Sequence, residues 1–289
     1  MTNSNVLLAV LAHPDDETFG MGGTLALYAR RQTDTYLLCA TRGEVGEMAP
    51  EYMRGFDTPA ERREAELRCA AETLGIKQVF FMGYRDSGMP GTPENQHPQA
   101  LINAPLETVA ADITHHIRRL RPQVVVTFDP IGGYRHPDHI AIHLATVKAF
   151  EMAGDPAYVD AEGLPPYQPQ RLFFQVIPRG FIRAAVFAMR LFGLNPRKFG
   201  QNKDIDLVSI AEVSFPIHAV VNFNPVARIR DEASRCHASQ GGAAQASGIQ
   251  AVLRRLFASN TELYMQAYPP IQGRVRRSKD LFAGIQGQG

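Results

Sequence analysis

Two short apolar runs, at 6–11 and 124–128, are each followed closely by a polar cluster that contains histidine and aspartate. Runs of five or six apolar residues bounded by polar loops are typical of strands buried on both faces of a parallel sheet. In such sheets ligands bind at the carboxyl ends of the strands. The pattern therefore predicts that the two clusters meet in one crevice. Their chemistry-bearing residues are His13, Asp15, Asp16, His136, Asp138 and His139.

Up to about residue 155, apolar runs alternate with helical patterns. The segment after Asp57 has a strong helix start, because a threonine cap is followed by proline and then glutamate. This alternation is typical of an α/β fold with a mostly parallel sheet and helices on both faces. In addition to the two apolar runs, we expect strands at 35–40 and 78–81, and helices at 22–31, 58–74, 105–120 and 138–153.

After residue 155 the pattern is weaker. We treat 1–289 as a single domain, in which 1–155 is the motif-bearing core and 156–289 an elaboration that shapes the substrate pocket. Strands are expected at 172–177 and 208–215, and helices at 225–238 and 247–258. The apolar segment 181–194 is too short to span a bilayer. We interpret it first as a buried or subunit-interface helix, then as a lid, and last as a helix that meets lipid.

Composition excludes several classes of protein. The chain has 289 residues with 45% hydrophobic and 20% charged residues, which is ordinary for a globular protein. A formal net charge of +1 gives no reason to expect a nucleic acid partner. Residues 1–5 lack the charged and apolar regions of a signal peptide, so none is expected, and no run reaches the roughly 18 apolar residues needed to span a bilayer. Cys39 and Cys69 lie in apolar patterns and are expected to be buried thiols, so we predict a cytoplasmic protein.

The two clusters together could bind one metal ion. His13 and Asp16 are three residues apart and can both point at one ion, and His139 is the natural third ligand. A catalytic zinc commonly takes three such ligands and keeps one position for water. No cysteine lies near either cluster, so an open catalytic site is favoured over a structural one. Iron(II) tolerates similar ligands and stays an alternative.

The remaining members of the clusters have the chemistry of catalytic groups. Asp15, beside the ligands, could take a proton from the attacking water. His136, as an imidazolium, could stabilise an oxyanion and then protonate a leaving amine. Asp138 could orient the His136 ring. Taken singly, an Asp-Asp pair before a helix is more often a cap and a lone histidine more often satisfied. The coincidence of both clusters at strand ends favours the metal site.

These motifs resemble the PIG-L/LmbE family of zinc-dependent N-deacetylases, in its mycothiol-pathway branch. The resemblance is carried by residues 12–17 and 136–139, and further by 83–89 and 132–134. It covers about residues 5–150 and implies a Rossmann-like, LmbE-like fold. It also implies zinc at the three ligands named above, Asp15 as general base, and His136, with Asp138 behind it, as the acid that stabilises the oxyanion.

The resemblance adds residues that the pattern alone does not single out. It implies that Tyr134 helps to polarise the amide carbonyl. It places Arg63 and Asp86 where the family binds sugar hydroxyls or an aglycone, and Glu47 as a further candidate for substrate contact. His237, within 236–240, resembles a C-terminal family segment near the site, and its membership of the site stays open.

The leading hypothesis is hydrolysis of an N-acetyl group on a small molecule that contains N-acetylglucosamine. One alternative is a metal-dependent amidase or esterase that acts on a non-sugar acyl substrate. Another is a non-catalytic metal-containing sugar-binding domain. The expected partner is a small amino-sugar substrate, and a homo-oligomer stays open. The sequence does not identify the aglycone, the pathway or the native metal.

Overall fold

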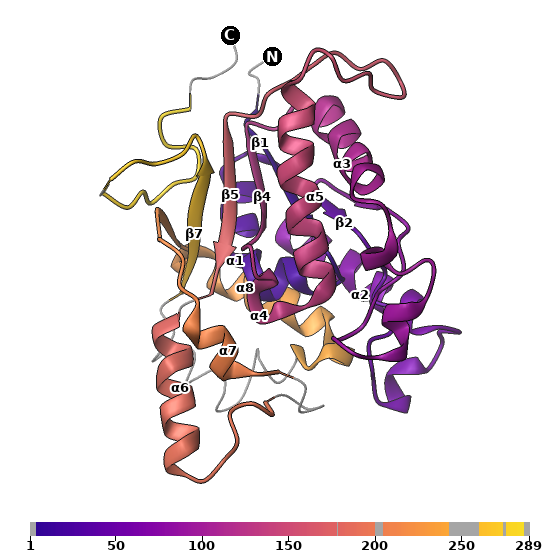
Figure 1. Ribbon diagram of the computed structural model, residues 1–289, viewed down its shortest axis with the longest axis vertical. Coiled ribbons are helices and arrows are strands. Elements are labelled where there is room, and N and C mark those ends of the chain that lie inside the picture. The colour runs from indigo at the N-terminus through magenta and orange to yellow at the C-terminus, as the bar shows by residue number, and fades with distance from the viewer. Residues whose placement is uncertain (1–3, 178, 200–204, 243–259, 274–275, 286–289) are drawn as a thin grey trace.

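The computed structural model describes residues 4–177, 179–199, 205–242, 260–273 and 276–285. Within them lies a seven-stranded sheet with the order β3-β2-β1-β4-β5-β7-β6 (Figure 1). Strands β3 to β5 in this order are parallel, whereas β7 is antiparallel to both of its neighbours. The expected mostly parallel α/β sheet is confirmed. The strands are β1 (Val6–Leu11), β2 (Asp34–Cys39), β3 (Gln78–Phe81), β4 (Val124–Phe128), β5 (Arg171–Val176), β6 (Ala219–Asn222) and β7 (Thr261–Tyr268).

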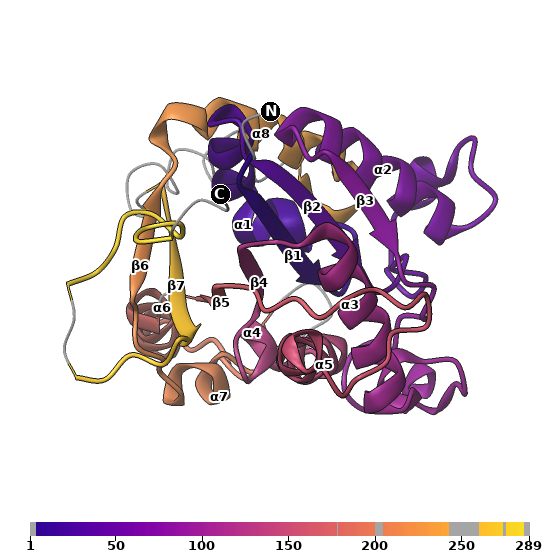
Figure 2. The same cartoon turned by 90° about the horizontal axis from the view of Figure 1, so that it is seen from above.

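Helices cover both faces of this sheet, as Figure 2 shows from above. Helices α1, α2 and α8 pack together on one face, and α3 packs against α5 on the other. The described α-helices are α1 (Asp16–Arg30), α2 (Pro59–Leu74), α3 (Leu106–Leu120), α4 (Gly132–Arg135), α5 (Pro137–Gly154), α6 (Arg179–Leu191), α7 (Leu207–Glu212) and α8 (Ala227–Cys236).

The centre of the sheet is also its topological switch point. Strand β1 lies between β2 and β4, and in the register of the sheet Ala9 is opposite both Leu37 and Val126. The chain moves outward from β1 to β3 on one side, then returns to β4 and continues to β5 on the other. Such a reversal leaves a crevice beyond the carboxyl ends of the two central strands. Both polar clusters follow these strands.

Helix α2 shows how local sequence sets an element's limits. The Thr58 hydroxyl accepts a hydrogen bond from the Glu61 backbone N–H at 3.2 Å, and the Glu61 carboxylate accepts one from Asp57 N–H at 2.9 Å. The threonine cap is the one that the sequence predicts, whereas the glutamate bonds to the N–H one residue before the cap and not to that of Thr58 itself, as a capping box would. The helix ends at Gly75, whose φ of 76° is a conformation that glycine adopts without a Cβ clash.

The first and last thirds of the chain differ from expectation in several elements. Helix α1 begins at Asp16 instead of near residue 22, with a kink at Met21. The expected strand at 208–215 is wrong: residues 207–212 form α7, because the Asp206 carboxylate accepts hydrogen bonds from the Val208 and Ser209 N–H groups and so caps a helix. The helix expected at 247–258 lies outside the described residues.

Helix α6 is not the buried helix that its apolar sequence indicates. Ile182 and Val186 are buried against α7, but Phe187 and Leu191 are each 71% exposed. The helix projects from the body of the molecule (Figure 1). Among the described helices, none has the length and apolar character that a bilayer span requires.

The cysteine prediction is half right. Cys39 is a buried free thiol, but Cys69 forms a disulfide with Cys236 across a sequence separation of 167 residues. The pairing depends on the contact between α2 and α8, which brings distant helix turns together. The spacing of the cysteines in the sequence does not indicate that the two helices are in contact.

Candidate metal and hydrolase site

The first cluster occupies the turn from β1 into α1. The Asp16 carboxylate accepts a hydrogen bond from the His13 backbone N–H at 2.8 Å, which ties the two residues together. Asp15 caps the helix with a φ of 119°, a conformation that non-glycine residues rarely adopt. Backbone strain of this kind persists where surrounding contacts hold it, and it is frequent at functional sites. Here the Asp15 N–H donates to the Glu17 carboxylate at 2.9 Å.

The second cluster is formed at the start of α5. Pro137 is the first residue of this helix and His136 is its cap, with Nδ1 accepting from the Asp138 N–H at 3.2 Å. Because Nδ1 is an acceptor, the proton of a neutral His136 ring resides on Nε2. His139 lies in the first helical turn and stacks on Phe128 at 3.9 Å between ring centroids.

The two clusters meet as predicted. His139 Nε2 lies 3.3 Å from His13 Nδ1 and 3.3 Å from an Asp16 oxygen, and His13 Nδ1 lies 3.5 Å from the other Asp16 oxygen. Ligands at the usual zinc–nitrogen distance of about 2.0–2.1 Å are about 3.3–3.4 Å apart at the corners of a tetrahedron. The two imidazole nitrogens, 3.3 Å apart, therefore fit two corners of a tetrahedron around one small cation, and the Asp16 carboxylate lies beside both rings, with one oxygen near each.

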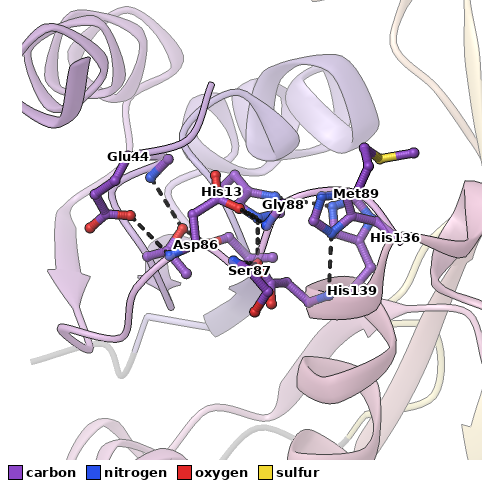
Figure 3. Close-up of polar contacts among 12 residues, drawn as sticks. His13, Glu44, Asp86, Ser87, Gly88, Met89, His136 and His139 are labelled. Carbon is purple, nitrogen blue, oxygen red and sulfur yellow. Dashed lines mark hydrogen bonds and ion pairs between the residues drawn. The ribbon is translucent and has the colours of Figure 1, made fainter. Parts of the chain in front are cut away.

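Neighbouring groups extend this donor set. The donor atoms of His13, His136 and His139 lie within 4.8 Å of one another, and so do those of His13, Asp86, His136 and Asp138. Figure 3 shows the three imidazoles grouped beside Asp86. Burial alone would lower the pKa of His13, but the carboxylates of Asp86, Asp138 and Asp16 raise it well above its usual value. This concentration of negative charge around an imidazole favours a bound cation.

The contact of Asp138 differs from the sequence expectation. Its carboxylate is fully buried and accepts from His13 Nε2 at 3.0 Å and from the Ser87 N–H at 2.9 Å. It therefore orients His13 and leaves His13 Nδ1 free for the ion, whereas its side chain was expected to orient His136. The sequence separation of 125 residues between His13 and Asp138 hides this contact.

His136 is a neutral ring in this environment. Burial, reinforced by the nearby His13 and His139 rings, lowers its pKa to about 2. This shift favours the neutral ring, an N–H donor, over the imidazolium that we expected. Tyr134 meets it edge to face, with ring centroids 5.9 Å apart, and meets His139 at 5.1 Å.

Asp15 has the electrostatics of a base. Burial raises its pKa to about 6, although the Arg63 guanidinium, 3.1 Å away, works in the opposite direction. Arg63 is itself 5% exposed and also donates to the carbonyl oxygens of Pro14 and Gly43. It thus fixes the position of Asp15, which is a more specific role than the substrate contact expected from sequence.

The residues expected to contact substrate are only partly gathered at the site. Asp86 is buried, its side chain accepts from the Gly88 N–H at 2.8 Å, and it lies 3.5 Å from His13 Nε2. Burial opposes ionisation, but His13 holds the pKa of Asp86 well below its usual range. Glu47 is exposed. The Glu44 carboxylate instead accepts from the Asp86 N–H at 3.0 Å (Figure 3). Glu44 and Glu47 are three residues apart in one loop, and the sequence alone does not show which of them reaches the site.

His237 joins the site from the C-terminal part of the chain. Its Nε2 lies 2.7 Å from the Glu17 carboxylate, and both side chains are fully buried. Glu17 in turn holds the Asp15 backbone, so His237 supports the strained turn that presents Asp15. The link from residue 237 to residue 17 passes through packing of α8 on α1, which no local pattern indicates.

Comparison with known proteins gives the same family. Residues 8–150 match the family model described as PIG-L, GlcNAc-PI de-N-acetylase. A 1D-myo-inositol 2-acetamido-2-deoxy-alpha-D-glucopyranoside deacetylase of Geodermatophilus obscurus is 39% identical over 250 residues, covering 83% of this chain and 84% of the relative. The enzyme with this name from Rhodococcus erythropolis is 34% identical and covers 96% and 97% of the two chains.

The fold agrees with a solved structure as well. N,N'-diacetylchitobiose deacetylase from Pyrococcus horikoshii superposes with a TM-score of 0.62 at 18% identity, over 91% of this chain and 84% of that one. At 18% identity this structural similarity shows only that the fold is shared. The family model and the two relatives carry the assignment, and this chain belongs to the PIG-L family.

Proposed function

We propose that the chain is a zinc-dependent hydrolase that removes the acetyl group from an N-acetylglucosaminide, the kind of substrate that the names of its relatives describe. The observation that carries the proposal is the meeting of buried His13 and His139 with half-buried Asp16, at spacings of 3.3, 3.3 and 3.5 Å, beside the carboxylate of Asp15. His13, Asp16 and His139 would hold the ion. Zinc bound there would polarise the amide carbonyl and lower the pKa of a water molecule.

Asp15 is the general base. A carboxylate with a pKa near 6 is ionised at neutral pH and is basic enough to accept a proton from the attacking water. Once protonated, it can pass this proton to the nitrogen as the C–N bond breaks, which yields acetate and a free amine. Arg63 holds the carboxylate in place through this cycle.

His136 stabilises the oxyanion that forms when water adds to the carbonyl. The ring is neutral and its Nδ1 is occupied by the Asp138 N–H, so Nε2–H is the available donor. A pre-positioned donor of this kind contributes most when charge develops in a dry site. Tyr134, packed against the same ring, is the second group on this side of the reacting carbonyl.

The sugar is expected on the side of Asp86. This carboxylate and that of Glu44 lie on loops that follow β2 and β3 and provide acceptors for hydroxyl groups. The direct test is acetate release from N-acetylglucosamine, N,N'-diacetylchitobiose, an N-acetylglucosaminyl-inositol and non-sugar amides, with and without a chelator. Chelator-sensitive release confined to the sugars supports the proposal, and release from the non-sugar amides alone would favour the amidase alternative.

A further inference from the structure

A large apolar cavity adjoins the metal donors, and Asp86 does not line it. It has a volume of about 410 Å³, and Asp16 and His139 form part of its wall. The rest of the wall comes mainly from the ends of β4, β5 and β7 and from α1. Its apolar members include Phe19, Phe128, Val176, Ile177, Phe223 and Leu263.

The cavity is much larger than an acetyl group requires. Pockets of about 300–1,000 Å³ hold whole small molecules, whereas the acetyl group places one methyl beyond the reacting carbonyl. Its polar members are in part already engaged, because the Glu262 carboxylate accepts from the Gly23 and Thr24 N–H groups at 2.9 and 2.7 Å. Gln175, Arg230 and Asn260 are further polar members, but most of the wall is apolar, so it suits a hydrocarbon chain better than a sugar.

The position of the cavity relative to the catalytic groups fixes the orientation of a substrate. Asp15, Asp86 and Arg63 lie on the half of the site built by β1, β2, β3 and α2, and none of them lines the cavity. A carbonyl held at Asp16 and His139 would thus direct its amine toward the charged half and its acyl chain into the apolar half. Tyr134 and Ile177, on the cavity wall, also pack against the α6–α7 cluster, which supports that wall from behind.

We propose that this cavity is an acyl-chain subsite and that the enzyme hydrolyses N-acyl amino sugars with chains longer than acetyl. The inference rests on the proposed function and deepens it. Water adds its hydroxyl to the acyl carbon, the C–N bond breaks, and the amine leaves with the proton from water, so the products are a medium-chain carboxylate and a free amino sugar.

The test is a chain-length series with the zinc-loaded protein and N-acetyl-, N-butanoyl- and N-hexanoylglucosamine, followed by release of the amine. Burial of one methylene changes affinity by about 0.8 kcal/mol, or about fourfold. The proposal predicts that kcat/KM rises by about two- to fourfold per methylene. A value that is flat or falls from acetyl to hexanoyl overturns the acyl subsite while leaving deacetylation intact.

Two variants, one in β7 and one directly after β5, fill the cavity from different segments, so the test does not depend on the folding of a single mutant. In Leu263→Trp and Ile177→Trp, the hexanoyl-to-acetyl ratio of kcat/KM should fall at least tenfold below that of the wild type. Val159→Trp, at a side chain that is 83% exposed, should keep the wild-type ratio. An unchanged ratio in both folded cavity variants would contradict the proposal.

Binding of the products separates the two proposals if no substrate is cleaved. By calorimetry, hexanoate should bind the zinc-loaded wild type at least tenfold more tightly than acetate and lose that advantage in Leu263→Trp. Such binding without turnover would refute the proposed hydrolysis and retain the apolar subsite. Equal binding of acetate and hexanoate would refute the subsite.

Discussion

Replacement of Asp138 by asparagine tests the contact that differs most from the sequence expectation. The Asp138 carboxylate is fully buried and lies 3.0 Å from His13 Nε2, on the side of the ring that faces away from the other donors. Loss of a carboxylate behind a metal-binding imidazole weakens metal binding by about 10–100-fold. This is about 1.4–2.7 kcal/mol, in the range expected for one buried hydrogen bond to a charged group.

Zinc affinity of Asp138→Asn, measured by competition with a chromophoric chelator at pH 7.5, should therefore fall by this factor. Saturating zinc should restore much of the lost turnover, because the variant retains the catalytic groups. Asp160→Asn is a matched control: Asp160 is also buried and lies 3.2 Å from a histidine ring, that of His115, on the distant α3. It should keep full zinc affinity. If Asp138→Asn binds zinc normally but loses turnover, the carboxylate acts on His136 and our reasoning is refuted.

Three further predictions follow from the site and its support. Asp15→Asn should bind one zinc ion and lose turnover by about 10²–10⁴-fold, since proton transfer is removed without a ligand; full activity would remove the general-base role. Because Asp15 must be ionised to act, kcat/KM should fall as the pH drops through about 6. Arg63 lowers the pKa of Asp15, so Arg63→Met should move this acidic limb of the pH profile upward by about 1 to 3 pH units, whereas Arg62→Met should not. An unmoved limb in Arg63→Met would contradict the pairing of Arg63 with Asp15. The double variant Cys69→Ser/Cys236→Ser should lose up to about 5 kcal/mol in free energy of unfolding in urea, as expected for a bridge that closes a loop of 167 residues; equal stability of oxidised wild type and variant would argue against the disulfide.

The sequence predicts best where one physical rule acts locally. Apolar runs locate β1 and β4, and the rule that ligand sites form at strand ends brings His13 and His139 together before any coordinates are known. The helix cap at Thr58 is equally local and is confirmed by its hydrogen bond to the Glu61 N–H.

Prediction fails where the partner of a side chain is chosen by tertiary packing. The Asp138 carboxylate contacts His13 instead of His136, and Cys69 is bridged to Cys236, through contacts between elements more than a hundred residues apart. The segment 208–215 is rich in apolar residues, as a strand would be, yet a single carboxylate at Asp206 is enough to cap a helix. His237 reaches Glu17 only because α8 packs on α1.

The zinc content of the purified His139→Ala variant tests the central claim most directly. Elemental analysis after equilibration with zinc should find one ion per chain in the wild type and in His143→Gln, whose histidine lies one helical turn further on and bonds to the Phe128 carbonyl. His139→Ala should contain almost none. One tightly bound ion per chain in His139→Ala would show that β1 and α5 do not bind a common metal, and would contradict the account.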